Sequence, residues 1–365
     1  MGEINLLIID NSKVYSTIFT RAAIDIDLNI KVTAVSNSSD ALKLISRKDF
    51  DVIVIDVITL DIDISAFFKE LTLEIPKALT LVTTQASSVS ERICAEAVTK
   101  GAFDYMIKPI HESYEVNLDV VKQKLSGIID KIKKDRNKEI IEPVNEFEKN
   151  ENNEKNKKNV KNVKINNEID FQPDIVLIAV STGGPMALES ILSKLDADFP
   201  APILIIQHMP AYFMETLAVH LDKKTKLNVK IAEDREFIKA KTVYIAPGGF
   251  HIKLDSKNRI RLDDSPPIHG IRPAADVLFE SVAESYKGVG ILAIILTGMG
   301  SDGEKGLFQL KNKQNCFCLI QSEETCVVYG MPRVVEESGL ADKIIDLDQI
   351  PDEMTVLLMG NVKDQ

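Results

Sequence analysis

Three apolar runs in the second half of the chain each end in a polar residue, and these residues are a serine, a histidine and an aspartate. The runs read DIVLIAVS, PILIIQH and GILAIILTGMGSD, and they end at Ser181, His208 and Asp302. Runs rich in Ile, Val and Leu, bounded by Gly and Pro, are typical of buried strands in a parallel sheet. Functional groups of open α/β sheets collect at the carboxyl ends of such strands. A nucleophile, a base and a carboxylate at three strand ends indicate a serine hydrolase.

The bulk composition limits the class of protein. A chain of 365 residues that is 45% hydrophobic is long enough for two folded domains. Its net charge of -11 argues against nucleic acid as a partner, because phosphate binding needs clustered Lys and Arg. The start, MGEINLLIID, lacks the basic residues of a signal peptide, and no run is apolar enough for membrane insertion. We therefore expect a cytoplasmic protein.

The composition changes sharply near the middle of the chain. In residues 145–170, 21 of 26 residues are Asn, Lys, Glu or Asp, too polar to build a core. A stretch with helical character, residues 115–138, leads into this segment. The sequence therefore predicts a first domain at residues 1–124, a helical extension and flexible linker at 125–172, and a second domain at 173–360.

The first domain alternates strands with amphipathic helices, as in a doubly wound α/β fold. Its predicted strands end in polar side chains that would meet at one edge of the sheet. Carboxylates there would suit Mg²⁺, an aspartate could accept a phosphoryl group, and a hydroxyl and a lysine would bind phosphoryl oxygens. The residues are Asp10, Asn11, Asp56, Thr83 and Lys108.

This pattern resembles the receiver domain of response regulators. The resemblance implies that Asp56 is the phosphoacceptor and that Thr83, Tyr105 and Lys108 are switch residues. It also implies Mg²⁺ as the cofactor of phosphorylation, with Asp10, Asn11 and Asp56 as ligands. Asn11 stands where most receivers carry a second acid, and an amide oxygen is a weaker ligand than a carboxylate.

The second domain contains two histidines that could serve as the base. His208 ends a buried strand next to the strand that carries Ser181, whereas His251 follows a Pro-Gly-Gly turn and would line a pocket. We favour His208, with Asp302 fixing its tautomer. Backbone N–H groups near Thr182, at a predicted helix start, would form an oxyanion hole. Later runs, HIKLD and RIRLD, predict an antiparallel hairpin inserted in the parallel core.

The combination of AVSTGGPMAL, QHMP, APGGFHIKL, ILTGMGSDG and CVVYGMPR behind a receiver resembles the chemotaxis protein-glutamate methylesterase (CheB) family. The resemblance implies a flavodoxin-like receiver joined to a Rossmann-like catalytic domain with a β-hairpin. It also implies the triad Ser181, His208 and Asp302, with no cofactor for catalysis. The residues expected to line the site or hold the oxyanion are Thr182, Gly183, Met299 and His251.

The activity implied by the resemblance is hydrolysis of glutamyl γ-methyl esters on methyl-accepting chemotaxis receptors. Deamidation of receptor glutamines is a related reaction of the family. The implied regulation is a receiver that covers the site until a histidine kinase supplies phosphate.

Two other readings of the sequence stay open. The second domain could bind a receptor or kinase without catalysis. Alternatively, the Ser-Thr-Gly-Gly turn could cradle a phosphate, although the chain lacks the Gly-Lys-Ser/Thr ending of a P-loop and the Gly-x-Gly-x-x-Gly pattern.

Overall fold

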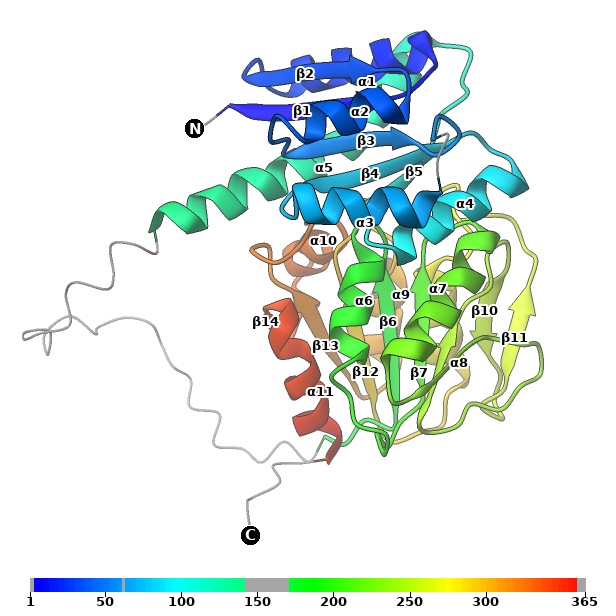
Figure 1. Cartoon of the computed structure of the whole chain (residues 1–365). Helices are drawn as coiled ribbons and strands as arrows, with labels where there is room; N and C mark the ends of the chain where they lie inside the picture. The colour runs from blue at the N-terminus through cyan, green and yellow to red at the C-terminus, as the bar shows by residue number, and fades with distance from the viewer. Residues whose placement is uncertain (1–2, 61–62, 142–170, 360–365) are drawn as a thin grey trace, which may run out of the picture.

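The computed structural model describes residues 3–60, 63–141 and 171–359. These residues form two α/β units, and the N-terminal unit lies across one end of the sheet of the other (Figure 1). The polar segment predicted as a linker, residues 145–170, lies outside the described residues. None of the helices in the described ranges is long and apolar enough to cross a membrane.

The N-terminal unit is built on five parallel strands in the order β2-β1-β3-β4-β5. The strands are β1 (Ile4–Ile9), β2 (Ile30–Val35), β3 (Val52–Asp56), β4 (Leu79–Thr84) and β5 (Asp104–Ile107). The helices are α1 (Lys13–Ile26), α2 (Ser38–Ile45), α3 (Ile64–Glu74), α4 (Ser88–Thr99) and α5 (Tyr114–Ile141).

Helices cover both faces of this sheet. Successive residues of a strand point to opposite faces, so Leu6 and Ile8 pack with α1 and α5, while Leu7 and Ile9 pack with α2, α3 and α4. This arrangement confirms the predicted doubly wound fold.

Helix α5 passes through the predicted domain boundary at residue 124 without a break. Beyond that point, Leu125, Ile128 and Ile129 are fully buried in the same cluster as strand β1 and helix α1. The folded N-terminal unit therefore includes the first part of the segment that we predicted as an extension.

The C-terminal unit contains seven parallel strands in the order β14-β13-β12-β6-β7-β9-β8. The strands are β6 (Ile175–Val180), β7 (Ile203–Gln207), β8 (Asn228–Ile231), β9 (Thr242–Ile245), β12 (Ile291–Ile295), β13 (Cys316–Gln321) and β14 (Lys343–Ile345). A separate antiparallel hairpin, as predicted, is formed by β10 (His251–Leu254) and β11 (Ile260–Asp263).

Six helices of the described ranges cover this second sheet. They are α6 (Gly184–Leu192), α7 (Ala211–Lys224), α8 (Ala275–Ser285), α9 (Glu304–Lys313), α10 (Met331–Glu337) and α11 (Ile350–Met359), with a short 3-10 turn at Leu347–Gln349. Helices α6, α7 and α11 pack on one face, and α8, α9 and α10 pack on the other. The carboxyl ends of β6, β7 and β12 therefore open at the edge that faces the N-terminal unit.

The two units meet along α4 and α7, and through Tyr105 of β5. The ring of Tyr105 stacks on Phe213 of α7, with ring centroids 4.3 Å apart. On α5, Gly127 lies so close to the loop of the other unit that an added Cβ would be 2.5 Å from Val328 Cγ2.

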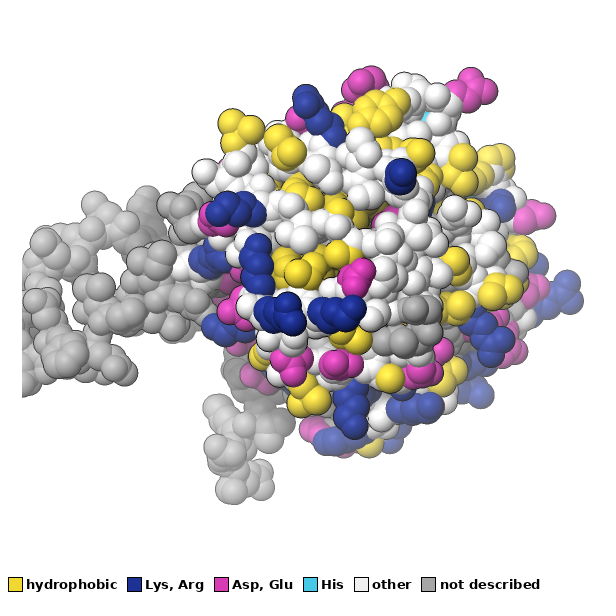
Figure 2. Space-filling model, turned by 45° about the horizontal axis from the view of Figure 1, so that its top comes forward, with side chains coloured by type: hydrophobic (Ala, Val, Ile, Leu, Met, Phe, Trp, Pro, Cys, Tyr) yellow, Lys and Arg dark blue, Asp and Glu magenta, His cyan; other side chains and the backbone are white. Residues whose placement is uncertain are grey.

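Figure 2 shows Lys and Arg interspersed with Asp and Glu on one face of the molecule.

Candidate active site

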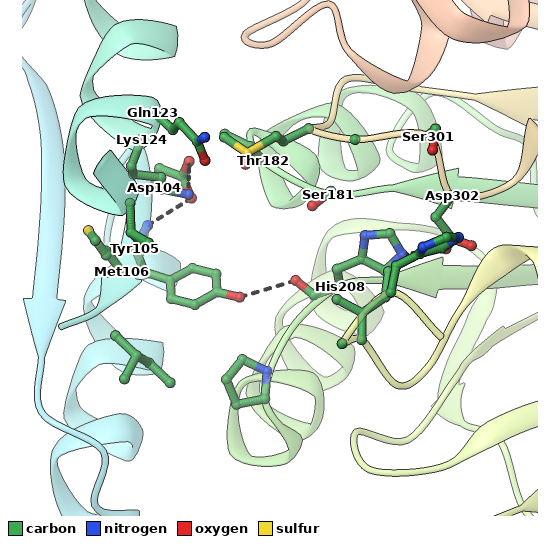
Figure 3. Close-up of a pocket in the computed structure, with 18 residues that line it drawn as sticks. Asp104, Tyr105, Met106, Gln123, Lys124, Ser181, Thr182, His208, Ser301 and Asp302 are labelled. Carbon is green, nitrogen blue, oxygen red and sulfur yellow. Dashed lines mark hydrogen bonds and ion pairs between the residues drawn. The ribbon is translucent and has the colours of Figure 1, made fainter. Parts of the chain in front are cut away.

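A cavity of about 840 Å³ lies where the two units meet. Figure 3 shows Ser181, His208 and Asp302 on one side of it, opposite Tyr105 and Lys124. The lining from the N-terminal unit comes from β5 and α5. The lining from the C-terminal unit comes from the segments that follow β6, β7 and β12 and from the loop at residues 269–271, between β11 and α8. The fold thus brings the three predicted strand-end residues into one site.

Ser181 is held by its backbone at the end of β6. Its N–H donates to the carbonyl of Thr297, at 3.0 Å, and its own carbonyl accepts from Gln207 Nε2, at 3.0 Å. Gly298 makes this approach possible, since a Cβ there would lie 2.8 Å from Ser181 Cβ. The backbone is therefore fixed while the hydroxyl faces the cavity.

His208 and Asp302 form a buried pair. Nε2 of His208 lies 2.7 Å from Oδ2 of Asp302, which directs Nδ1 away from the carboxylate. Asp302 also accepts from the N–H groups of Ala275, at 2.6 Å, and Asp276, at 3.0 Å. Burial acts to raise the pKa of Asp302, but these hydrogen bonds and His208 outweigh it and hold the pKa below its usual value.

Ser181 and His208 are neighbours in the cavity, but among the described residues no hydrogen bond joins the Ser181 hydroxyl to the imidazole. Contacts of this kind are often long in unliganded sites and shorten when substrate binds. The structure thus pairs His208 with Asp302, and Ser181 lines the cavity beside this pair.

Several backbone N–H groups at the cavity have no acceptor within the described part of the chain, and those of Thr182 and Met299, where the oxyanion is expected, are among them. Thr182 precedes the left-handed Gly183 (φ +78°) that begins helix α6, where the helix dipole favours negative charge. An oxyanion between these donors is the arrangement that acyl transfer needs. Gly183 itself is buried behind Thr182, outside the cavity lining.

His251 does not line the cavity, contrary to our expectation. Its side chain is fully buried, Nδ1 accepts from the N–H of Ala274 at 3.1 Å, and Nε2 lies 3.3 Å from the carbonyl of Pro266. The sequence shows only a Pro-Gly-Gly turn before His251. It does not show that both ring nitrogens have backbone partners, so it could not distinguish a buried histidine from one that lines the cavity.

The sequence did not point to two residues, Thr297 and Gln207, whose side chains hold the backbone around the site. Thr297 donates to the carbonyl of Thr182 through its hydroxyl, which also accepts from the N–H groups of Val327 and Val328. Gln207 bonds the Ser181 carbonyl. Both residues lie inside motifs quoted above, Thr297 in ILTGMGSDG and Gln207 in QHMP, and that position was the available indication.

In the N-terminal unit, the predicted phosphoacceptor pocket is also assembled. Lys108 is buried, and its Nζ lies 2.7 Å from Asp10 Oδ2 and 2.8 Å from Asp56 Oδ2. The Thr59 hydroxyl donates to Asp56 Oδ2, at 3.3 Å, and this hydroxyl also accepts a hydrogen bond from the N–H of Asn11. Thr83 is buried and donates to the carbonyl of Ile55, while Tyr105 points away, into the interface.

A lysine neutralises the two carboxylates that were expected to hold Mg²⁺. The Lys108 ammonium lies between the two carboxylates, and the described residues contain no cluster of three or more His, Cys, Asp or Glu suited to a metal. Asn11 is exposed beside this pair and brings no charge. Binding of Mg²⁺ stays a prediction, and no step below depends on it.

The fold and the site together define a class of protein: a receiver-type domain placed over a serine-hydrolase site at the end of a second parallel sheet. The CheB methylesterase family model matches residues 176–354, and the response regulator receiver domain model matches residues 6–116. The chain belongs to the CheB methylesterase family, in a form that carries a receiver domain.

Relatives span nearly the whole chain. The protein-glutamate methylesterase/protein-glutamine glutaminase of Halalkalibacterium halodurans is 36% identical over 97% of this chain and 98% of its own. Its namesake from Thermotoga maritima is 37% identical over 83% of this chain and 85% of its own. The crystal structure of the Thermotoga maritima CheB methylesterase catalytic domain is 44% identical, with a TM-score of 0.49, covering 51% of this chain and 99% of that one.

Proposed function

We propose that this protein hydrolyses glutamyl γ-methyl esters on methyl-accepting chemotaxis receptors and releases methanol. The observation that carries the proposal is the His208–Asp302 pair at 2.7 Å, beside Ser181 in one cavity. The relatives described above are named for the same activity.

The mechanism begins with the nucleophile and its base. His208 Nδ1 takes the hydroxyl proton as Ser181 Oγ attacks the ester carbonyl carbon, while Asp302 holds the proton on Nε2 and stabilises the imidazolium. The N–H groups of Thr182 and Met299 bind the oxyanion of the tetrahedral intermediate.

The intermediate then collapses. The bond to the methoxy oxygen breaks, His208 returns its proton to that oxygen, and methanol leaves. Water, deprotonated by His208, next attacks the acyl-Ser181 ester, which frees the glutamate carboxylate and restores the serine hydroxyl. Deamidation of a receptor glutamine would follow the same steps with ammonia as the leaving group, as the glutaminase part of the relatives' name suggests.

The receiver domain limits access to this chemistry. Its β5 and α5 form one wall of the cavity, and the Tyr105 ring stacks on Phe213, so a receptor helix reaches Ser181 only when the two units separate. Phosphorylation of Asp56 by a histidine kinase is the proposed trigger. It would replace the Lys108–Asp56 ion pair with new contacts to phosphoryl oxygens.

The test uses membranes that carry chemoreceptors with isotope-labelled methyl esters. The full-length protein should release labelled methanol, and a small phosphodonor should increase the rate. Binding to the receptors without methanol release would instead support the non-catalytic alternative. An equal rate with and without phosphodonor, and for Asp56→Ala, would reject the trigger while leaving the hydrolase in place.

A further inference from the structure

The N-termini of helices α8 and α9 cap each other: a carboxylate at the start of each helix accepts hydrogen bonds from backbone N–H groups at the start of the other. Asp302, just before α9, accepts from the N–H groups of Ala275 and Asp276, the first two residues of α8. In return, Asp276 Oδ1 accepts from the N–H of Gly303, at 3.0 Å, and of Gly306, at 2.8 Å, in the first turn of α9. Each carboxylate thus satisfies donors that its partner helix leaves unpaired.

The exchange fixes the position of Asp302 relative to the base. Gly303 follows Asp302 directly, so the bond from its N–H to Asp276 holds the peptide next to the carboxylate that binds His208. Gly306 lets the two helices approach closely, because a Cβ there would lie 2.8 Å from Asp276 Cα. Both carboxylates are only 4% exposed, so water does not replace these bonds.

The two carboxylates differ in their electrostatic surroundings. Burial raises the pKa of Asp276, and the nearby charge of Asp302 adds to this effect, although the N–H groups of Gly306 and Gly303 oppose it. The pKa of Asp302 is shifted the other way by its bond with His208. The role of Asp276 is therefore to accept hydrogen bonds, which an amide oxygen also does.

We infer that Asp276 is a positioning residue for the Ser-His-Asp site: through Gly303 and Gly306 it holds the Asp302 carboxylate against His208. This inference rests on the proposed hydrolase function. It predicts a loss of turnover when the acceptor is removed, because a displacement of about 1 Å in a catalytic group costs about 10²-fold in rate.

The kinetic test compares three variants of the full-length protein. Asp276→Ala should lower kcat for methanol release about 10²-fold with KM unchanged, whereas Asp276→Asn should keep near-wild-type kcat because its amide oxygen accepts both bonds. Asp174→Ala is the matched control, since Asp174 also accepts two loop N–H groups, from Val289 and Gly290, at the far end of the sheet. Equal rates for Asp276→Ala and Asp174→Ala, or equal losses for Asp276→Ala and Asp276→Asn, would overturn the inference.

A spectroscopic readout separates this inference from the proposed function. The ring proton between His208 and Asp302 should give a downfield proton resonance, assigned by its loss in His208→Gln. The resonance should persist in wild type and Asp276→Asn, and shift or disappear in Asp276→Ala. A wild type that keeps the resonance without releasing methanol would refute the methylesterase and leave the positioning role standing. An unchanged resonance in Asp276→Ala would refute the positioning role alone. If Asp276→Ala does not fold, loss of the resonance in a folded Asp276→Asn decides against the inference.

Discussion

The hydroxyl of Tyr105 in the receiver donates a hydrogen bond to the backbone carbonyl of His208, at 3.1 Å, so the receiver contacts the main chain of the residue that we propose as the catalytic base. Burial at the interface raises the pKa of the Tyr105 phenol well above its usual value, so the hydroxyl stays protonated and able to donate at neutral pH. A movement of Tyr105 would therefore change the hydrogen bonding of the His208 backbone without any change in the sheet.

Removing this hydrogen bond should raise the activity of the unphosphorylated protein. A hydrogen bond contributes about 1 kcal/mol, which is about fivefold in the equilibrium between covered and open sites. Tyr105→Phe, measured by methanol release without phosphodonor, should therefore be about fivefold faster than wild type. Tyr114→Phe, at an exposed site on α5, is the control. A slower or unchanged Tyr105→Phe would show that this bond does not hold the receiver in place.

Close packing at Gly127 gives an independent way to separate the domains. An added Cβ would lie 2.5 Å from Val328 Cγ2, so Gly127→Ala should raise basal activity even though alanine favours the helix. Val328→Ala removes the clashing methyl group and keeps the backbone N–H that bonds Thr297. The double variant should return to the basal rate of Val328→Ala alone, and failure of this rescue would place the effect of Gly127→Ala elsewhere.

The Lys108 ammonium neutralises two buried carboxylates, and its loss should destabilise the receiver. Lys108→Ala leaves Asp10 and Asp56 without their cation, and breaking a buried pair of this kind costs about 3–5 kcal/mol. Urea denaturation followed by circular dichroism should show a clearly lower midpoint. Lys43→Ala removes only an exposed pair with Asp40 and should leave the midpoint where it is. Matching midpoints for the two variants would contradict the pairing seen here.

The lowered pKa of Asp302 predicts that the stability of the fold depends on pH. Its pKa in the folded protein lies below the usual 3.8, so its interactions stabilise the fold above that value and are lost as pH falls through the folded pKa. The difference in unfolding free energy between wild type and Asp302→Asn should therefore be full at neutral pH and shrink in strong acid. A difference that grows with acidity would mean that the sign of the shift is wrong.

Much of the fold followed from strand patterns in the sequence. The buried runs that end at Ser181, His208 and Asp302 are unbroken apolar segments, which parallel strands with both faces covered require. Strands β8 and β14 are harder to recognise in the sequence, because they are the two edge strands of the sheet, have only four and three residues, and leave most of those residues at least partly exposed.

The parts of the site that escaped prediction are tertiary contacts. The exchange between Asp276 and Asp302 joins residues 26 positions apart through backbone N–H groups, which leave no pattern of residue types. Predicting that Tyr105 and Lys124 form one wall of the cavity would require knowing how the two domains dock. His251 was misplaced for the same reason, since its backbone partners are set by the fold around it.

The most direct test of the account is the rate of methanol release from methyl-esterified receptors by Ser181→Ala. Removing an activated nucleophile should reduce the phosphodonor-stimulated rate by orders of magnitude, while Ser190→Ala, on helix α6 but outside the cavity that Ser181 lines, should match wild type. Release of methanol by Ser181→Ala at the wild-type rate would contradict the central claim that Ser181, with His208 and Asp302, performs the reaction.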